Sequence, residues 1–585
     1  PPLDIPVLSV TGTIIPSRSY LTFDRFVARS VSGAMMGAGS FDFGPHGPNL
    51  AAALSLSPMS AATLMRLWPV TVGYEARKWV VDNVRSGQIE TAEMEFSLLP
   101  LDMDGDPQTN SAMERTIDIA VTYRDASLVL PGELPAMVSA AGKAVVANQH
   151  VTLDATSAAL VPPEGGRVEV EDFYADIPSV IARPPIGTIR ARLSGPAAAM
   201  ASLADQEPID ALKLLAVAPS DLSGSVSARI NAVGPLGQMI EPDALKWSVD
   251  AQLTDVASAV PIQNKTVKGA TLSVIADATQ ASLKGKATVD GVHATIDYTA
   301  VFAGADQGQA GDVSFVLTEA ERKKRGWDLG SLLRGPISIN VIDSSDGKRR
   351  VEANLKDARL TVPGFGWTKG AGVPAKASFE LVENDKTVEV NDLKVSSDGL
   401  DVVGAVRIED GQLASAIFER FALRPNDQAT LKVQRAEKGG YDVSLAGRSL
   451  DGRGFLASLK NRADGDASGA SGMSGPLNLR VALDTVQGNG GINLSGLNGT
   501  VRLNGDQVSS LDLSASSNGG RSKDVVATLS PAGNGARALS VATGDTGRVL
   551  KFLGIYQRLV GGKGTLDARF NRDGPTTGMV TVARF

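Results

Sequence analysis

Apolar and polar side chains alternate along most of this chain. The pattern is clearest in residues 89–99, where four apolar positions are separated by Thr, Glu and Ser. These apolar positions are Ala92, Met94, Phe96 and Leu98. Because successive side chains of a β-strand point to opposite faces, the pattern predicts a strand with one apolar and one polar face. The same alternation fills most of residues 221–460 and much of the remaining sequence, so a mainly β fold is predicted.

Short turn sequences separate many of the predicted strands. An Asp-Gly or Asn-Gly pair between two alternating segments is typical of a type I′ hairpin, in which both central residues adopt positive φ. The pairs are Asp290-Gly291, Asp346-Gly347, Asp398-Gly399, Asp410-Gly411, Asn504-Gly505 and Asp573-Gly574. They predict that neighbouring strands run antiparallel.

Helical periodicity appears in only a few places. A helix pair is predicted within residues 58–86, with Trp79, Val80 and Val84 near one face and Gly87 ending the second helix. A helical insert is predicted over 196–217, where Pro196 precedes an alanine-rich segment.

A last amphipathic helix is predicted over residues 546–560. Its apolar positions fall largely on one side, and Gly561-Gly562 should end it. These positions are Val549, Leu550, Leu553, Tyr556 and Leu559.

So few helices cannot cover the apolar faces of so many strands. The sheet must therefore fold over on itself as sandwiches or curl into a trough that holds something apolar. At roughly 12–15 residues per strand and turn, the chain would hold about 40 strands, and one continuous sheet would extend on the order of 190 Å. The predicted fold is mainly β: an elongated, twisted antiparallel sheet that forms a U-shaped groove, with a few short amphipathic helices.

The length exceeds what one hydrophobic core usually serves, so we divide the sequence into segments. A run of small residues at 463–475 is interpreted as a linker or exposed loop. The segments are 1–135 with the helix pair, 136–345 with the helical insert, 346–462, the 463–475 linker, and a C-terminal β segment 476–585 with the last helix.

The charge pattern argues against a nucleic-acid partner. The 585 residues carry a formal net charge of −7, and only residues 322–325 and 348–350 are densely basic. We interpret both clusters as solvated loops, because binding to phosphates needs an extended basic surface. The chain has no cysteine, no stretch of roughly 18 apolar residues and no leader-like start.

No reaction centre can be assembled from the sequence. The three histidines, His46, His150 and His293, are too dispersed for a metal site. Residues 102–106 resemble a calcium loop only superficially, because Pro107 and Met113 stand where such a loop needs Gly and Glu. Neither a nucleophile elbow nor a phosphate-binding loop is present. We therefore expect no enzyme activity, no cofactor and no bound metal.

Three segments resemble a known family. The first combines Trp68-Pro69 and Ala76-Arg77 with Trp79, Asn83, Gly87 and Ile89. The second is Ser449–Leu456, with sequence SLDGRGFL, and the third is Leu550–Phe570. Together they resemble the AsmA-like proteins of Gram-negative envelopes, in particular the YhdP-type and TamB-related members.

The resemblance implies a periplasmic protein with a long β-groove that carries phospholipid between the inner and outer membranes and supports the outer-membrane barrier. It also implies tethering to the inner membrane through an N-terminal helix that this sequence lacks. Phospholipid, the two membranes and other envelope proteins are the implied partners.

Ten residues are predicted to line such a groove, although each also fits ordinary packing in the core of a sheet. They are Met94, Phe96, Leu98, Ile296, Tyr298, Phe302, Phe379, Leu381, Leu566 and Phe570. A rival hypothesis is a periplasmic scaffold for the assembly of outer-membrane proteins, which would bury its apolar faces in closed double layers. A carbohydrate-active enzyme would instead need a cleft with a close pair of carboxylates.

Overall fold

The computed structural model divides the chain into two units, Pro1–Gln307 (unit 1) and Gly308–Phe585 (unit 2), and each is described separately. The structure describes residues 5–31, 33–44, 47–68, 74–98, 117–130, 133–180, 182, 184–206, 217–236, 244–262, 264–301, 308–327, 329–343, 349–362, 365–384, 386–437, 439–457, 476–504, 507–520, 522–533, 535–571 and 576–584. The predicted four-segment division is untested by this structure and stays a prediction.

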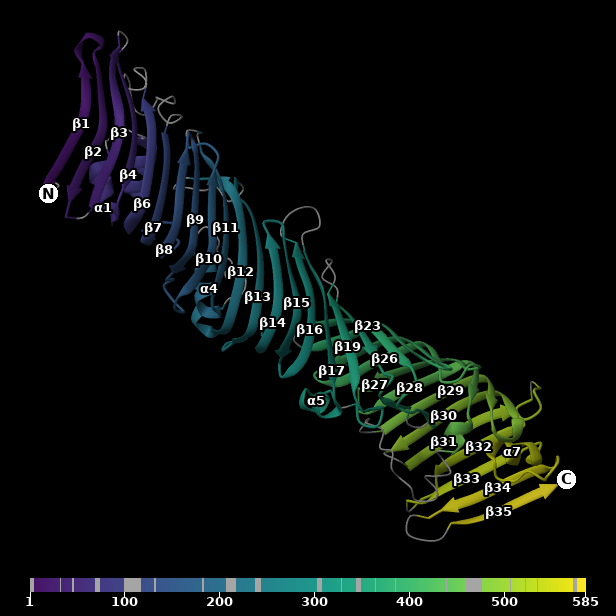
Figure 1. Cartoon of the computed structure of the whole chain (residues 1–585). Coiled ribbons are helices and arrows are strands. Elements are labelled where there is room, and N and C mark those ends of the chain that lie inside the picture. Colours follow the sequence, from purple (N-terminus) through teal and green to yellow (C-terminus); the bar gives the residue numbers. More distant parts are fainter. Residues whose placement is uncertain are drawn as a thin grey trace. The chain divides into compact units, whose positions relative to one another are not determined.

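The fold is mainly β, as the alternation predicts (Figure 1). Thirty-two described strands pair in an extended sheet that is not closed into a barrel. A separate three-stranded sheet is formed by β18 (Leu333–Arg334), β21 (Arg359–Val362) and β22 (Trp367–Lys369).

Unit 1 is an antiparallel meander in which each long strand pairs with the next one. Its strands are β1 (Val7–Ile15), β2 (Tyr20–Ser30), β3 (Gly33–Gly44), β4 (Gly47–Leu56), β5 (Met59–Ser60), β6 (Val84–Leu98), β7 (Ile117–Leu128), β8 (Met137–Ala147), β9 (His150–Leu160), β10 (Val168–Ile177), β11 (Ile186–Pro196), β12 (Leu222–Pro235), β13 (Lys246–Ser258), β14 (Val267–Asp277), β15 (Gln280–Val289) and β16 (Val292–Val301). Strand β4 pairs directly with β6, and the short β5 pairs with the first part of β6.

Unit 2 repeats this arrangement with one exception. Its strands are β17 (Gly308–Leu317), β19 (Ile337–Asp343), β20 (Arg349–Asn354), β23 (Ala375–Asn384), β24 (Thr387–Ser397), β25 (Leu400–Glu409), β26 (Gln412–Ala422), β27 (Gln428–Arg435), β28 (Tyr441–Asp451), β29 (Pro476–Gln487), β30 (Asn493–Asn504), β31 (Gln507–Ser516), β32 (Val525–Pro531), β33 (Arg537–Thr543), β34 (Lys563–Phe570) and β35 (Thr577–Ala583). Strands β28 and β29 are parallel, so the expectation of a purely antiparallel sheet is wrong there. A parallel pair needs a crossover, and the predicted 463–475 linker falls in this connection, outside the described residues.

The predicted helix pair is present, but its second member is shorter than expected. Helix α1 (Ala61–Leu67) begins at Ser60, whose side chain accepts a hydrogen bond from the Thr63 amide. Helix α2 spans Tyr74–Asn83, and the next residue already belongs to β6, so Gly87 lies inside a strand rather than at a helix end. Trp79 is 46% exposed, which corrects its expected place on a buried face.

Of two further helices, the first agrees with the sequence expectation and the second is shorter than expected. Helix α4 covers Ala197–Ala204, and most of the remaining predicted insert lies outside the described residues. Helix α7 spans only Thr546–Leu553 and ends at Gly554, which adopts the left-handed conformation with φ 73°. The predicted helical continuation over residues 554–560 is therefore wrong.

The two basic clusters are not loops as the charge pattern predicts, although Lys323, Lys324, Arg349 and Arg350 are exposed to solvent. Residues 322–324 lie in helix α5 (Glu319–Lys324), which Thr318 and Glu321 cap reciprocally. Arg322 is buried and donates hydrogen bonds to the carbonyls of Leu317, Leu333 and Gly335. In the second cluster, Arg349 and Arg350 begin strand β20.

Glycines without room for a side chain mark sharp bends in the strands. A Cβ atom on Gly142 would lie 2.0 Å from the Asp154 carbonyl oxygen, and one on Gly285 would lie 2.2 Å from that of Thr271. The same close approach recurs at Gly12, Gly404, Gly447 and Gly499. Many strand pairs also contain a register shift, often beside a residue with positive φ such as Asp125, Asp172 or Asp255. Such bulges and glycine kinks bend strands, so they curve the sheet within each unit.

Candidate functional site

One side of the sheet is apolar across strands β6 to β16 of unit 1, and we call it the inner face. It contains cross-strand rows of neighbouring side chains. One row crosses β6 to β10 and consists of Met94, Ile119, Val146, Val151 and Ile177. A second crosses β11 to β16 and consists of Leu193, Ala228, Ala251, Val274, Leu283 and Tyr298.

Charged residues of the same strands lie on the opposite, outer face. Lys284 and Asp297, for example, pair across β15 and β16 at 3.1 Å. Among the described paired positions of β6 to β16, the rows that run through Met94 and Tyr298 contain no charged side chain. The inner face can therefore hold apolar groups without leaving a charge unpaired beside them.

Unit 2 presents a matching inner face. A row that crosses β26 to β29 is formed by Phe418, Leu431, Leu445 and Val481. Its counterpart across β31 to β34 is formed by Leu513, Ala527, Val541 and Leu566. Cations appear at the ends of some strands on this face: Arg537 donates to the Val508 carbonyl and lies 5.7 Å from the ring centre of Phe570.

Burial changes along each strand of the inner face. In β16, Val292 and Ala294 are buried, whereas Ile296, Tyr298 and Ala300 are half-buried. In β25 of unit 2, residues Leu400 and Val402 are buried, whereas Val406 and Ile408 are half-buried. In these two strands the inner face therefore has a closed end, where the side chains are buried, and an open end, where they keep contact with solvent. Strand β7 differs, because Ile117 and Ile119 at the corresponding open end are buried as well.

Helices and small elements cover the closed ends. In unit 1, Leu64 and Trp68 of the α1 region and Ala199 and Leu203 of α4 belong to one core with strands β4 to β11. Figure 1 shows α4 at one end of the neighbouring strands rather than across their whole length. No helix of the described residues is long and apolar enough to cross a membrane.

The closed end of unit 2 is built in the same way. Val549 and Phe552 of α7 lie in a core with residues from one end of several strands, such as Leu400 of β25, Phe421 of β26 and Val486 of β29. Phe365, in the connection between β21 and β22, packs edge-to-face on Phe421 with ring centres 5.2 Å apart. Among the described residues, this core does not extend to the open end of the same strands.

A polar network fixes the closed end of unit 2. Asp451 pairs with Arg424 and Arg453, and although burial raises its pKa, these hydrogen bonds lower the pKa to about 2. Asp427 accepts hydrogen bonds from the amides of Leu423, Arg424 and Asp451, while burial raises its pKa. Asp451 and Arg453 belong to the SLDGRGFL segment, so these polar residues of the family-like segment have a structural role here.

A buried lysine performs a similar task elsewhere in unit 2. The Lys369 Nζ donates hydrogen bonds to the carbonyls of Leu355, Lys356 and Ala358, at 2.5, 3.0 and 2.6 Å. Burial lowers the pKa of Lys369. With all three donors engaged, Lys369 ties the small sheet to the connection after β20 and has no free proton donor to offer a reaction.

The predicted lining residues lie on the inner face wherever their side chains are described. Met94 is buried in the unit 1 core, and Phe96 is half-buried beside it. The half-buried residues nearer the open ends are Ile296, Tyr298, Phe379, Leu381, Leu566 and Phe570. The side chains of Leu98 and Phe302 are outside the described set.

The described histidines form no site. The His150 ring lies 2.5 Å from the Asp176 carboxylate, and His293 is exposed on the outer face beside Thr288. His46 is outside the described residues, as are residues 101–116 with the calcium-like sequence. Within the described residues no group of His, Cys, Asp and Glu could hold a metal ion.

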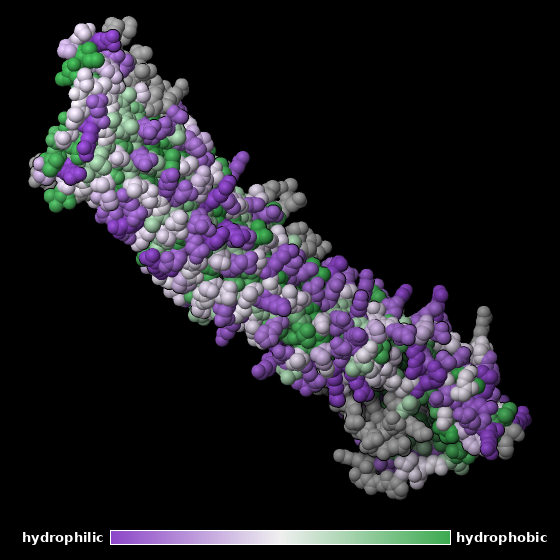
Figure 2. All heavy atoms as spheres, viewed as in Figure 1, coloured by the Kyte–Doolittle hydropathy of each residue, from purple (hydrophilic) through white to green (hydrophobic). Residues whose placement is uncertain are grey.

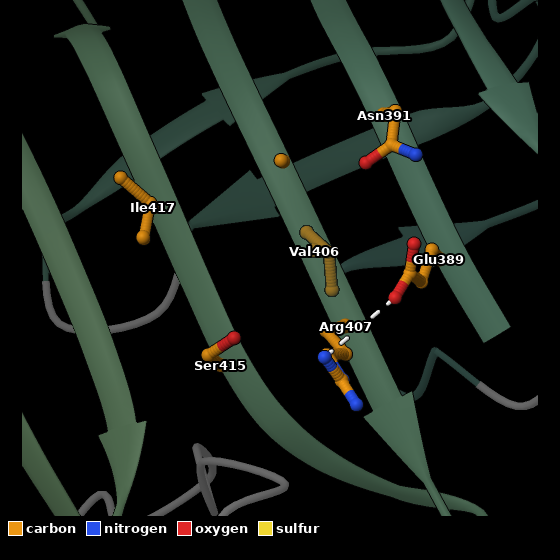
Figure 3. Close-up of a pocket in the computed structure, with 7 residues that line it drawn as sticks. Glu389, Asn391, Val406, Arg407, Ser415 and Ile417 are labelled. Carbon is orange, nitrogen blue, oxygen red and sulfur yellow. Dashed lines mark ion pairs between the residues drawn. The ribbon is translucent and has the colours of Figure 1, made fainter. Parts of the chain in front are cut away.

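Two shallow depressions lie on the outer face. One, of about 150 Å³, is lined by Glu389 and Arg407, which form an ion pair, together with Ser415 (Figure 3). The other, of about 560 Å³, lies where Ala38, Ala51 and Ala53 leave room between longer side chains. Neither depression combines a nucleophile, a base and an oxyanion donor, so neither suggests catalysis.

The accessible surface of the chain is large for its mass. It amounts to 32851 Å², whereas a compact monomer of 60.7 kDa would expose about 20000 Å². Figure 2 shows hydrophobic residues exposed among hydrophilic ones on the viewed side. The chain therefore exposes more surface than one compact monomer of its mass would.

Sequence reasoning identified the inner face, but it did not show where along each strand that face changes from a closed to an open end. The signals that could have revealed the bends are glycine or aspartate in the middle of an alternating segment, such as Gly142, Asp172 and Gly285. Comparison with protein-family models, curated proteins and solved structures finds no match.

Proposed function

We propose that this protein is a non-enzymatic lipid carrier of the bacterial envelope, which holds phospholipid acyl chains on the inner face of its sheet. The proposed location is the periplasm, with tethering to the inner membrane and transport of phospholipid between the inner and outer membranes. The observation that carries the proposal is the half-buried, charge-free apolar surface at the open end of the inner face, seen in Ile296, Tyr298 and Ala300 of β16.

The dimensions of this surface suit an acyl chain. The half-buried segment from Ile296 to Ala300 spans five residues, which corresponds to roughly 15 Å of strand. One leaflet of a bilayer has a hydrocarbon thickness of about 15 Å, half of the ~30 Å core. At about 0.8 kcal/mol per buried CH₂, an acyl chain would be held without any specific polar contact. The headgroup would remain at the open end, in contact with water.

The resemblance of three sequence segments to AsmA-like envelope proteins supports the same proposal. That resemblance gives the envelope location and the phospholipid cargo, whereas the structure contributes the apolar face.

A scaffold for outer-membrane protein assembly is the second candidate, favoured by the terminal strands. Strand β1 pairs with β2 along one side, and Leu8, Val10 and Ile14 are 64%, 58% and 71% exposed. Exposed apolar side chains of this kind can bind another protein. The scaffold function would use this surface, whereas lipid carriage would use the inner face.

Site-specific photocrosslinking separates the two candidates. Tyr298→benzoylphenylalanine places a photoreactive ring on the inner face, and the matched control Asp297→benzoylphenylalanine places it on the outer face of the same strand. The full chain is expressed in the envelope of a Gram-negative host, irradiated, purified and analysed by mass spectrometry for lipid adducts.

Lipid carriage predicts phospholipid adducts at position 298 and at least tenfold fewer at position 297. The same comparison at Phe379 and its neighbour Ser378 extends the test to unit 2. Equal labelling at both members of each pair, or no lipid at either position 298 or 379, would reject the proposal. Adducts to outer-membrane proteins at a third position, Leu8, would then favour the scaffold.

A further inference from the structure

A second feature of unit 2, separate from the inner face, exposes several large apolar side chains together. It is the 546–562 loop, which consists of α7 and the residues that follow it. The side chains of Leu553, Ile555, Tyr556 and Val560 are 39%, 68%, 51% and 74% exposed. Packing does not explain four such residues within eight positions, because the large apolar side chains that this segment buries are Val549 and Phe552.

The two ends of this loop are fastened together. The Thr546 amide and hydroxyl both donate to the Gly562 carbonyl, at 2.7 and 2.9 Å, and the Gly547 amide donates to the Gly561 carbonyl at 3.0 Å. Close approach is required here, since a Cβ on Gly547 would lie 2.5 Å from the Leu559 oxygen. The arrangement is a compact Ω-like loop whose ends are held while its middle faces solvent.

The middle of the loop is also held in place. The Ile555 amide donates to the Leu550 carbonyl at 3.0 Å, and Asn489 donates its side-chain amide to the Phe552 carbonyl at 3.2 Å. The exposed apolar side chains are therefore presented by a backbone with several fixed points, and little ordering would be needed for them to bind.

The charged side chains of this segment are all positive. From Thr546 to Leu566 the sequence contains four cations and no acidic residue, in a chain whose net charge is −7. The cations are Arg548, Lys551, Arg558 and Lys563. Within the part of the chain that the structure describes, no acidic side chain pairs with Lys551, Arg558 or Lys563. The partner of this loop should accordingly be apolar and negatively charged.

We propose that the 546–562 loop docks unit 2 onto the surface of a lipid bilayer that contains anionic lipid. Leu553, Ile555 and Val560 would enter the boundary between headgroups and acyl chains, where the amphipathic Tyr556 ring is also stable. Lys551 and Arg558 would lie among the anionic headgroups. A protein partner would need a matching acidic and apolar surface, whereas a bilayer offers both features at once. This docking does not depend on lipid carriage by the inner face.

A single reactive label tests the contact directly, because the chain contains no cysteine. Ile555→Cys is labelled with a polarity-sensitive fluorophore, and Ile275→Cys, an isoleucine 58% exposed on β14 in unit 1, is the matched control. The purified full chain is mixed with vesicles of phosphatidylglycerol and phosphatidylcholine in a 3:7 ratio, or of phosphatidylcholine alone. The emission at position 555 should shift to the blue with the anionic vesicles, and that at position 275 should not.

Flotation of the unlabelled protein gives the second readout. The double variant Tyr556→Ser/Val560→Ser should reduce partitioning into anionic vesicles at least tenfold, and the control Val233→Ser/Ile275→Ser, on exposed strand positions, should not. Lys551→Gln/Arg558→Gln should reduce it by a similar factor at low salt, since each headgroup-level cation contributes severalfold.

Three results would overturn the docking proposal. They are an unchanged emission at position 555, equal flotation of the Tyr556/Val560 variant and the native chain, or equal flotation with neutral and anionic vesicles. An unchanged emission at position 555 is the outcome expected of a loop that binds only protein. Because crosslinking of lipid at Tyr298 is measured separately, either proposal can fail without the other.

Discussion

The two ends of a single strand have different surroundings although their sequences follow the same pattern. In β25, Val402 at the closed end is buried and Val406 at the open end is half-buried, yet both are valines on the inner face. The difference comes from what covers them. The α7 region and the β21–β22 connection pack over the closed end, and no described element covers the open end in the same core. An apolar row in a sequence therefore predicts a face, but it does not predict whether that face is filled.

The largest expected difference between the two ends concerns phenylalanine. Phe421→Ala at the closed end removes a side chain that is 5% exposed and packs on Phe365 and Phe418. The variant should lower the free energy of unfolding of unit 2 by about 3–5 kcal/mol, because it leaves a cavity. Chemical denaturation followed by circular dichroism measures this loss.

Phe379→Ala at the open end is the matched control for that variant. Its ring is half-buried, so the loss should be about 1–2 kcal/mol, while lipid adducts at neighbouring inner positions should decrease. Equal losses for the two variants would show that the open end is packed as tightly as the closed end, and the distinction between the ends would have to be abandoned.

The second prediction concerns the bend that separates the two ends in β15. Gly285 lies between the half-buried Leu283 and the buried Ala287, and a Cβ there would meet the Thr271 carbonyl oxygen at 2.2 Å. Gly285→Ala should therefore destabilise unit 1 by about 2–4 kcal/mol, since backbone must move. Gly370→Ala, where nothing lies within 4 Å of the added atom, is the control and should be nearly neutral in thermal denaturation. A neutral Gly285→Ala variant would show that the strands can pass this point without the bend.

The smallest of the three effects tests the polar network of the closed end. The Asp451 pKa is lowered to about 2 from 3.8, so its ion pairs stabilise unit 2 above pH 4 and stop doing so as the pH falls toward 2. Asp451→Asn should cost about 2 kcal/mol at pH 7 and close to nothing at pH 2. Urea denaturation at both values measures the difference, and a cost that does not change with pH would mean that the carboxylate charge is unimportant.

The sequence predicted the strands and their faces well because period-two alternation directly reflects a half-buried sheet. Met94, Ile296, Phe379 and Leu566 all lie on the inner face for this reason. Local turn chemistry was equally informative, and Asp290 and Gly291 adopt the positive φ values expected of the hairpin.

Features set by tertiary contacts were not predictable in this way. Arg322 looked like a surface charge, but three backbone carbonyls hold it in the interior. The amphipathic spacing of residues 546–560 suggested one helix, whereas Gly554 ends it and leaves Ile555 and Tyr556 exposed. The parallel pairing of β28 with β29 depends on a crossover that no local pattern encodes.

The absence of charge in the inner-face rows also has a kinetic meaning. For an acyl chain that lies on this face, each strand offers nearly the same apolar surface as the last, repeated every ~4.8 Å. Steps between adjacent strands of one unit would then change the free energy little, and no charged side chain in the row through Tyr298 would act as a trap. Movement along such a surface is diffusive and has no preferred direction. Any net flow would have to be imposed where lipid enters and where it leaves.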